Sequence, residues 1–185
     1  MASLYYVPEG YEPPVRKRLQ NLPKGNNMLS VLARRVGQFA FGTLALGTKA
    51  LLSPVAFGAH ALLVDRDGRV AFARHSYRPG LSLPGGGVKR GEPPDQAILR
   101  ELAEELGRVR SDPPVLFGLY TRRTALATNV IALYRLMNSE VDFRPSLEVR
   151  ELVFADPAAP PPGVTQGTAR RLAEHLGQAP ISPYW

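Results

Sequence analysis

Three glutamates, Glu101, Glu104 and Glu105, lie within six residues of one another near the middle of the chain. In a helix, residues three and four apart are neighbours, so the three carboxylates are expected to share one face. Each like-charge pair at this spacing costs roughly 0.2–0.5 kcal/mol unless a cation relieves it. Magnesium prefers oxygen ligands and is often held by a few carboxylates together with substrate phosphates. The spacing therefore predicts a divalent-metal site. For the glutamates taken without their neighbours, a solvated helix face is the competing interpretation.

A helix over Pro94–Leu106 would position these glutamates, because proline suits the first helical turn and Gly107 suits the position just past the end. Glu104 and Glu105 would lie near its C-terminus, where the macrodipole disfavours anions, so without metal each is expected to cost stability. The opposite side is expected to pack on the core, and it comprises Ile98, Leu99, Leu102, Ala103 and Leu106.

The loop before this helix could also contribute to a metal or phosphate site. Gly85, Gly86 and Gly87 let the backbone approach a ligand closely, and a carbonyl there can add a neutral oxygen ligand. Glu92 lies two helical turns before Arg100, and a pair between the two would fasten the loop to the helix.

This segment resembles the signature of the Nudix (MutT-like) hydrolase superfamily. That signature reads Gly, five residues, Glu, seven residues, Arg-Glu, a hydrophobic residue, any residue, Glu-Glu, any residue, Gly and a hydrophobic residue. Arg108 departs from it in the last place, and Val109 is expected to take over the packing role. The matching positions are Gly86, Glu92, Arg100, Glu101, Leu102, Glu104, Glu105 and Gly107.

The resemblance implies an α/β/α sandwich that holds one to three Mg²⁺ ions, with Mn²⁺ able to substitute. By the family pattern, the three helical glutamates and the Gly86 carbonyl hold the metal, while Arg100 and Glu92 orient them. A metal-activated water would then hydrolyse a phosphoanhydride bond in a nucleoside diphosphate-linked or nucleotide substrate. Relatives often use a further carboxylate outside the signature, for which Glu148 is the first candidate and Glu151 the second.

The remaining sequence predicts the α/β (α+β) fold class with a mixed sheet. A hairpin is expected from strands Val55–Val64 and Arg69–His75. Further strands are expected at Val115–Arg122, Asn129–Met137 and Glu148–Phe154, with a closing helix at Thr165–Leu176. Residues 1–52 are interpreted as an N-terminal arm with a helical extension, Asn27–Leu52, and residues 53–185 as the hydrolase domain.

Composition restricts the partners. The chain has no cysteine, which excludes disulfides, a thiolate nucleophile and Cys-ligated zinc. Its net charge of +7 divides into +5 for residues 1–55 and +2 for residues 56–185, so the basicity belongs mainly to the N-terminal segment. No secretory signal or transmembrane segment is visible, and we expect a cytoplasmic protein. A small nucleotide-type substrate is expected and nucleic acid is not required, while the oligomeric state is left open, with a homodimer as one option.

Two other functions compete with hydrolysis. One is a catalytically silent domain of the same fold that binds a ligand or a regulatory partner. The other is a nucleic-acid or membrane-surface protein that uses the basic N-terminal segment. For single residues outside the signature, Arg74 is given even odds of lining the substrate pocket. Structural roles are favoured for the others, which are Arg122, Arg123, His75, Tyr120 and Tyr134.

Overall fold

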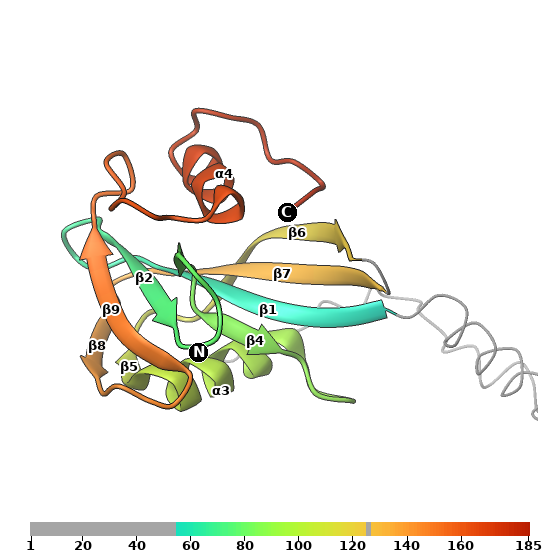
Figure 1. The fold of residues 1–185 in the computed structure, drawn as a ribbon, viewed down its shortest axis with the longest axis horizontal. Coiled ribbons are helices and arrows are strands. Elements are labelled where there is room, and N and C mark those ends of the chain that lie inside the picture. Colours follow the sequence, from blue (N-terminus) through green and yellow to red (C-terminus); the bar gives the residue numbers. More distant parts are fainter. Residues whose placement is uncertain (1–54, 125–126) are drawn as a thin grey trace, which may run out of the picture. The chain divides into compact units, whose positions relative to one another are not determined.

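The computed structural model describes residues 55–124 and 127–185, so the predicted arm and the helix Asn27–Leu52 lie outside the described residues. A four-stranded sheet has the order β4-β1-β7-β6 (Figure 1). Its strands are β1 Val55–Leu63, β4 Gly85–Gly87, β6 Val115–Arg123 and β7 Thr128–Leu136. β1 runs parallel to β7, while β4 and β6 are antiparallel to their neighbours, so the predicted mixed sheet is confirmed.

The predicted hairpin is wrong. Its strands exist as β1 and β2 (Val70–His75), and Gly68 takes a φ of 79° in the turn between them. However, β2 pairs with β3 (Leu81–Ser82) and β9 (Val149–Ala155) in a second sheet. Only an isolated bridge from Val64 to Val70 joins the two segments, because β1 finds its partners in β4 and β7.

A third, two-stranded sheet pairs β5 (Gly107–Arg110) with β8 (Glu140–Phe143), and the sequence did not predict either strand. β5 begins at Gly107, directly after the helix Pro94–Leu106 ends. Val109 on this strand packs against the core while Arg108 is exposed, as the departure from the signature led us to expect.

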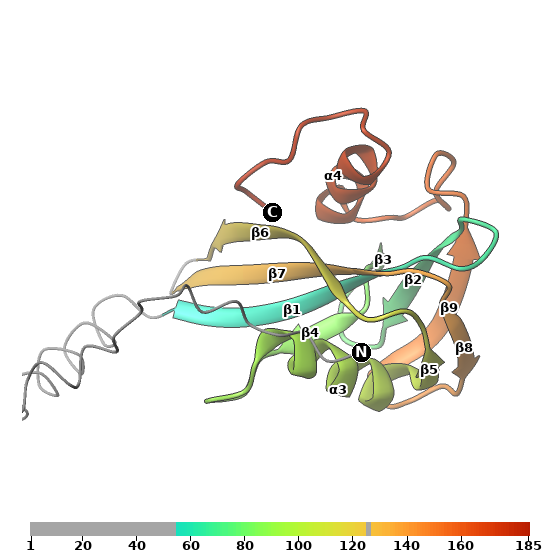
Figure 2. The same ribbon diagram turned by 180° about the vertical axis from the view of Figure 1, so that it is seen from behind.

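Two helices cover opposite sides of the four-stranded sheet (Figures 1 and 2). The helix α3 (Pro94–Leu106) has the predicted bounds, and α4 (Gln166–His175) is capped by the side chain of Thr165. The strand β1 serves both cores, because Ala59, Ala61 and Leu63 join the cluster beneath α3 while Leu62 joins the one beneath α4. This arrangement confirms the predicted α/β/α sandwich.

The burial of α3 differs from its predicted faces. Leu99 is 47% exposed and Ala103 is exposed, although both were assigned to the core side. Glu105 was assigned to the exposed side, yet only 3% of it is exposed. The buried face of the helix is therefore rotated toward Ala97 and Glu105 relative to the expected apolar stripe.

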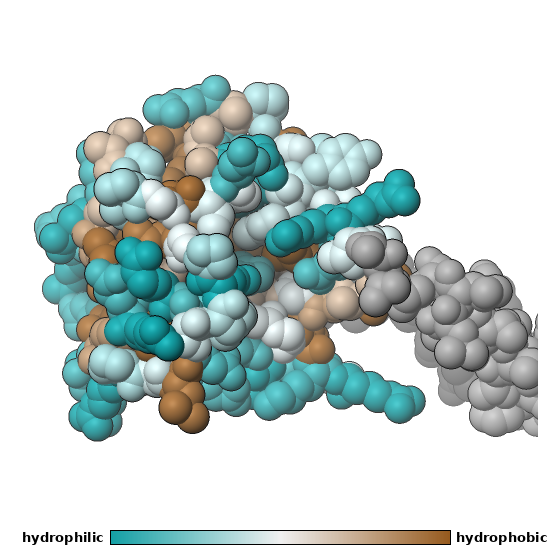
Figure 3. All heavy atoms as spheres, viewed as in Figure 1, coloured by the Kyte–Doolittle hydropathy of each residue, from teal (hydrophilic) through white to brown (hydrophobic). Residues whose placement is uncertain are grey.

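The outer surface is polar on the face that Figure 3 shows, where hydrophilic residues predominate and hydrophobic ones are scattered between them. Among the residues that the structure describes, no helix is both long and apolar enough to cross a membrane.

Candidate active site

Arg100 lies at the centre of the predicted site and binds the loop to the helix. Its Nε and Nη2 donate to the two carboxylate oxygens of Glu92 at 2.7 and 2.8 Å. Nη1 donates to Glu101 at 2.6 Å, and Nη2 also reaches the carbonyl of Gly87 at 2.9 Å. The predicted pair between Glu92 and Arg100 is thus present in bidentate form, which is the strongest geometry for these groups.

This pairing fixes the charge of both partners. Hydrogen bonds from Arg100, with a second contribution from the backbone N–H of Lys89, lower the pKa of Glu92 to about 2. The hydrogen bonds of Arg100 to Glu92 and, second, to Glu101 raise the pKa of Arg100 above its ordinary value. Both groups therefore stay ionised across the neutral range.

Glu104 is the most exposed of the three helical glutamates. Its side chain is 55% exposed, accepts a hydrogen bond from Arg100 Nη1 at 3.2 Å and lies 3.7 Å from Lys89 Nζ. Both contacts are with cations, so the like-charge repulsion expected at this position is offset in part. Exposed pairs of this kind contribute only about 0–1 kcal/mol.

Glu105 points inward instead. Its Oε2 accepts the backbone N–H of Gly85 at 2.8 Å, and its Oε1 lies 3.7 Å from Nδ1 of buried His75. Burial raises the pKa of Glu105 to about 7; the Gly85 hydrogen bond opposes the shift, and the charges of Glu101 and Glu148 add to it. Near neutral pH this carboxyl therefore exchanges between its acid and its carboxylate form.

Two of the three glycines, Gly85 and Gly86, are required by close approaches of the backbone. A side chain on Gly85, where φ is 131°, would collide with the carbonyl of Ala59 on the neighbouring strand. A side chain on Gly86 would collide with the carboxylate of Glu101. The loop therefore presses its backbone directly against a charged group of α3, as the run of glycines led us to expect.

The two candidates for the additional carboxylate have different surroundings in the structure. Glu148 lies just before β9, and its charge raises the pKa of both Glu105 and Tyr77, which places it within electrostatic range of the α3 carboxylates. Glu151 instead accepts a hydrogen bond from Arg74 Nε at 2.6 Å. Arg74 is thus engaged in an exposed pair with Glu151.

The donor set suits a hard divalent ion in kind, because it consists of carboxylate and carbonyl oxygens. Within residues 55–124 and 127–185, however, no three acidic or imidazole side chains are gathered closely enough to hold an ion as they stand. The physical reason is that Glu101 and Glu104 turn toward Arg100, while Glu105 turns toward Gly85. Metal binding would require these side chains to change partners.

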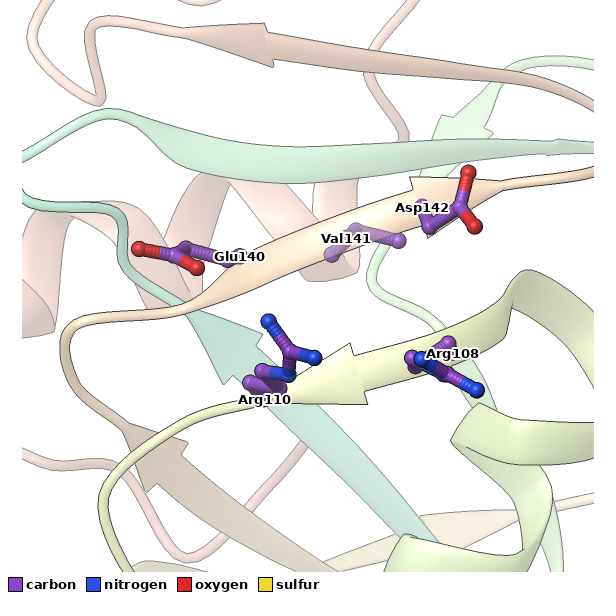
Figure 4. Close-up of a pocket in the computed structure, with 5 residues that line it drawn as sticks. All are labelled: Arg108, Arg110, Glu140, Val141 and Asp142. Carbon is purple, nitrogen blue, oxygen red and sulfur yellow. The ribbon is translucent and has the colours of Figure 1, made fainter.

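Several hollows lie away from this cluster. Figure 4 shows a small one, of about 250 Å³, where Arg108 and Arg110 of β5 lie beside Glu140, Val141 and Asp142 of β8. None of its residues belongs to the predicted site. The larger cavity, of about 490 Å³, lies between α4 and the sheet and includes Arg122, for which sequence had favoured a structural role.

The surroundings of the site include residues with the expected structural roles and two residues that sequence reasoning missed. The ring of His75 is buried, and neither nitrogen has a hydrogen-bond partner, so it packs rather than bonds. Tyr120 is a core residue, as expected, and donates to Glu174 at 2.9 Å. Arg78 and Trp185 line the larger cavity. The sequence analysis singled out neither residue.

Comparison with known proteins agrees with this geometry. The model of the NUDIX domain matches residues 54–162, which is more than half of the chain. The chain therefore belongs to the Nudix hydrolase family, and the predicted family and enzyme class are confirmed.

Among solved structures, the chain resembles the MutT Nudix hydrolase from Burkholderia pseudomallei, with a TM-score of 0.58 and 25% identity over 65% of this chain and 97% of that one. It also resembles the MutT protein from Methanosarcina mazei Go1, with a TM-score of 0.57 and 18% identity over 68% and 95%. The second likeness concerns the fold alone.

Curated relatives match over a shorter stretch. The RNA pyrophosphohydrolase of Hydrogenovibrio crunogenus is 38% identical over 55 residues, which is 30% of this chain and 33% of that protein. The one from Proteus mirabilis is 40% identical over 55 residues, or 30% and 31%. The chain thus covers about a third of the length of these relatives.

Proposed function

We propose that this protein hydrolyses a pyrophosphate bond in a nucleoside diphosphate-linked or nucleotide substrate. The observation that carries the proposal is the arrangement around Arg100, which holds Glu92, Glu101 and Glu104 within hydrogen-bonding distance of one guanidinium. Beside it, Glu105 is buried with a raised pKa. Perturbed carboxylates gathered against a glycine loop are typical of a reactive site.

Mg²⁺ would be held by Glu101, Glu104, Glu105 and the carbonyl of Gly86. When bound, it polarises phosphate oxygens and lowers the pKa of a coordinated water. The protonation state of Glu105 would respond to the metal. Glu105 ionises fully when positive charge arrives, because a nearby cation favours the charged form of a carboxyl.

Arg100 and Glu92 would act as positioning residues. Their bidentate pair ties the loop to α3, so the Gly86 carbonyl and the Glu101 carboxylate stay on the same side of the substrate. Glu148 would accept the proton of the attacking water, since it is the exposed carboxylate that acts on Glu105 from outside the helix.

The substrate class is proposed as a small nucleotide-type molecule. Some relatives are named RNA pyrophosphohydrolase, and for that reason a 5′-triphosphorylated RNA end is included as a test substrate. These relatives match this chain over only about a third of their own length, so RNA is one candidate among several. Free nucleoside triphosphates, dinucleoside polyphosphates and ADP-ribose complete the set. All of these present a phosphoanhydride bond.

The test is a screen of these substrates with Mg²⁺, Mn²⁺ or chelator, read by release of phosphate, pyrophosphate and nucleotide. We expect metal-dependent turnover that falls by roughly 10²-fold or more in Glu101→Gln. Glu140→Gln is the matched control, because Glu140 is an exposed glutamate paired with Arg66 and has no assigned role in the site. Full turnover in chelator would refute the metal requirement. Tight binding of a nucleotide without turnover under any metal would favour a silent binding module instead.

A further inference from the structure

Two large side chains, one aromatic and one aliphatic, are exposed at one end of the three-stranded sheet. Tyr77 lies two residues past the end of β2 and is 65% exposed, and Leu147 lies two residues before the start of β9 and is 96% exposed. Neither belongs to the two hydrophobic cores of the described residues. Single exposed apolar side chains are ordinary on a protein surface, so these two are informative only through what surrounds them.

Hydrogen bonds hold the two loops that carry these side chains against each other. Ser76 donates its N–H to the carbonyl of Glu148 at 2.8 Å, one residue beyond the last pair of the ladder between β2 and β9. The hydroxyl of Ser76 also donates to the carbonyl of Leu147 at 2.7 Å. Tyr77 and Leu147 are the next residues on the two chains, so they occupy neighbouring positions at the end of this sheet.

Tyr77 lies beside the carboxylates of α3. The centroid of its ring is 5.4 Å from that of the His75 ring, and Nδ1 of His75 is 3.7 Å from a carboxylate oxygen of Glu105. Partial burial raises the pKa of the Tyr77 hydroxyl; the charge of Arg78 opposes this shift, and the charges of Glu105 and Glu148 add to it. The exposed ring is therefore a neighbour of the proposed metal site and stands just outside it.

The loop that carries Leu147 is fastened to the C-terminal end of α3. The hydroxyl of Ser146 donates to the carbonyl of Glu105 at 3.3 Å, and Arg144 donates its N–H to the carbonyl of Leu106 at 3.3 Å. The two views of the fold agree that the end of β2 and the start of β9 lie beside this helix (Figures 1 and 2). Leu147 therefore has a defined position relative to the carboxylates, although its side chain is in solvent.

A cation lies next to the Tyr77 ring. The guanidinium carbon of Arg78 is 5.6 Å from the centroid of that ring, and in the described part of the chain its Nε is buried without a hydrogen-bond partner. Buried polar groups are nearly always hydrogen-bonded, and phosphate is an anion that a guanidinium binds well, so Arg78 favours a phosphate oxygen near the ring. An exposed aromatic ring beside a phosphate position suits a nucleoside that is joined through that phosphate.

We propose that Tyr77 and Leu147 form a platform for a second base, the base at the far end of the phosphate chain in a substrate with a nucleoside at each end. The base would stack on the ring of Tyr77, and Leu147 would cover its edge. The proposal rests on the proposed function, because the phosphate chain must first be bound at the α3 carboxylates. Every nucleobase has a planar face, so such a platform favours a second nucleoside without selecting its base.

The test compares two tetraphosphates that differ only in the second nucleoside, diadenosine tetraphosphate and adenosine 5′-tetraphosphate, with the full chain and Mg²⁺. The ratio of their kcat/KM values measures what the second nucleoside contributes. We expect the wild type to favour diadenosine tetraphosphate by roughly tenfold or more, which is the usual range for a base stacked on an aromatic side chain. Tyr77→Ala should remove most of this preference, whereas Tyr77→Phe should keep it because the ring remains.

Leu147→Ala should lower the same ratio by a smaller factor, because it removes contact area and no ring. Tyr184→Ala and Leu116→Ala are the matched controls, since these residues are 69% and 54% exposed and have no assigned role. Both controls should leave the ratio unchanged. Thermal unfolding of all variants checks the fold, and Tyr77→Phe keeps the test valid if the alanine variant is unstable.

The outcomes separate this proposal from the proposed function. Turnover with an unchanged ratio in Tyr77→Ala would overturn the platform and leave the hydrolase intact. An equal loss with both tetraphosphates would show that Tyr77 acts through the carboxylates, which also overturns it. A dependence on Tyr77 that is seen only with a 5′-triphosphorylated dinucleotide RNA would overturn the choice of substrate.

If neither tetraphosphate is hydrolysed, the proposed function fails and the platform is still tested. Calorimetric titration of the two compounds with Mg²⁺ present then gives their affinities directly. A preference for diadenosine tetraphosphate that is lost in Tyr77→Ala and kept in Tyr77→Phe would support the platform, and equal affinities in the wild type would overturn it.

Discussion

Replacing Glu105 by glutamine should stabilise the metal-free protein at alkaline pH and change its stability little at pH 5. The folded-state pKa of Glu105 is raised to about 7, above the ordinary 4.5, so its contribution to stability is present below pH 4.5 and is lost as pH rises to 7. A shift of this size costs about 3 kcal/mol once the carboxylate is ionised, and less than about 1 kcal/mol at pH 5.

Glutamine avoids this cost because it cannot ionise. Its side-chain oxygen can keep the hydrogen bond from Gly85 N, and its amide group would face Nδ1 of His75, which now lies 3.7 Å from Glu105 and lacks a partner. With only 3% of Glu105 exposed, solvent screens this site weakly.

The assay is urea unfolding of both proteins in chelator at pH 5 and pH 8.5. The difference in free energy of unfolding should favour Glu105→Gln by about 2–3 kcal/mol more at pH 8.5 than at pH 5. Excess Mg²⁺ should then stabilise the wild type and not the variant, since a ligand of the folded state adds RT ln(1 + [L]/Kd). A difference that does not vary with pH would show that Glu105 ionises normally, and the reasoning on its burial would be wrong.

Four further predictions concern the same site and its surroundings. Glu104→Gln should change the stability of the metal-free protein by no more than about 0.5 kcal/mol, because its pairs are exposed, yet lower turnover by roughly 10²-fold or more; an unfolding series with initial rates checks both. Arg100→Lys should destabilise the protein, since lysine cannot reproduce the bidentate pair with Glu92, and unchanged thermal unfolding would contradict this. Glu148→Gln should reduce kcat while leaving Mg²⁺ affinity and the fold largely intact; if it is fully active while Glu151→Gln is dead, the two roles are reversed. Deletion of residues 1–25 should spare turnover, and inactivity of a folded deletion variant would show that the segment contributes to the substrate pocket.

Sequence alone predicted the helix and its fastening to the loop. Pro94 and Gly107 mark the two ends of α3, and the eight-residue spacing of Glu92 and Arg100 already implied their pair. These features are local, because turn residues, caps and fixed spacings operate within a few turns of chain. The mixed sheet was expected from a different signal, the order of strands and helices along the chain.

Pairing between strands was harder to predict. The segments of β1 and β2 look like a hairpin because a turn with Gly68 joins two apolar runs. The turn does form, and it is closed by the bridge between Val64 and Val70, but the pairing extends no further. Which strand lies beside β1 depends instead on β7, about seventy residues later in the chain. The alternation of apolar and polar residues within one strand does not indicate which distant strand will pair with it.

Helical periodicity also placed Glu101, Glu104 and Glu105 in one environment, whereas the structure gives each a different one. Glu101 is held by Arg100, Glu104 lies mainly in solvent, and Glu105 is buried against Gly85. Arg100 offsets the like-charge cost expected from their spacing for Glu101 and Glu104. For Glu105, burial is the main cause of the raised pKa, and the charge of Glu101 adds to it. It follows that a divalent ion must compete with Arg100 for Glu101 and with a proton for Glu105. Metal affinity should consequently rise with pH through about 7, the value to which burial raises the pKa of Glu105.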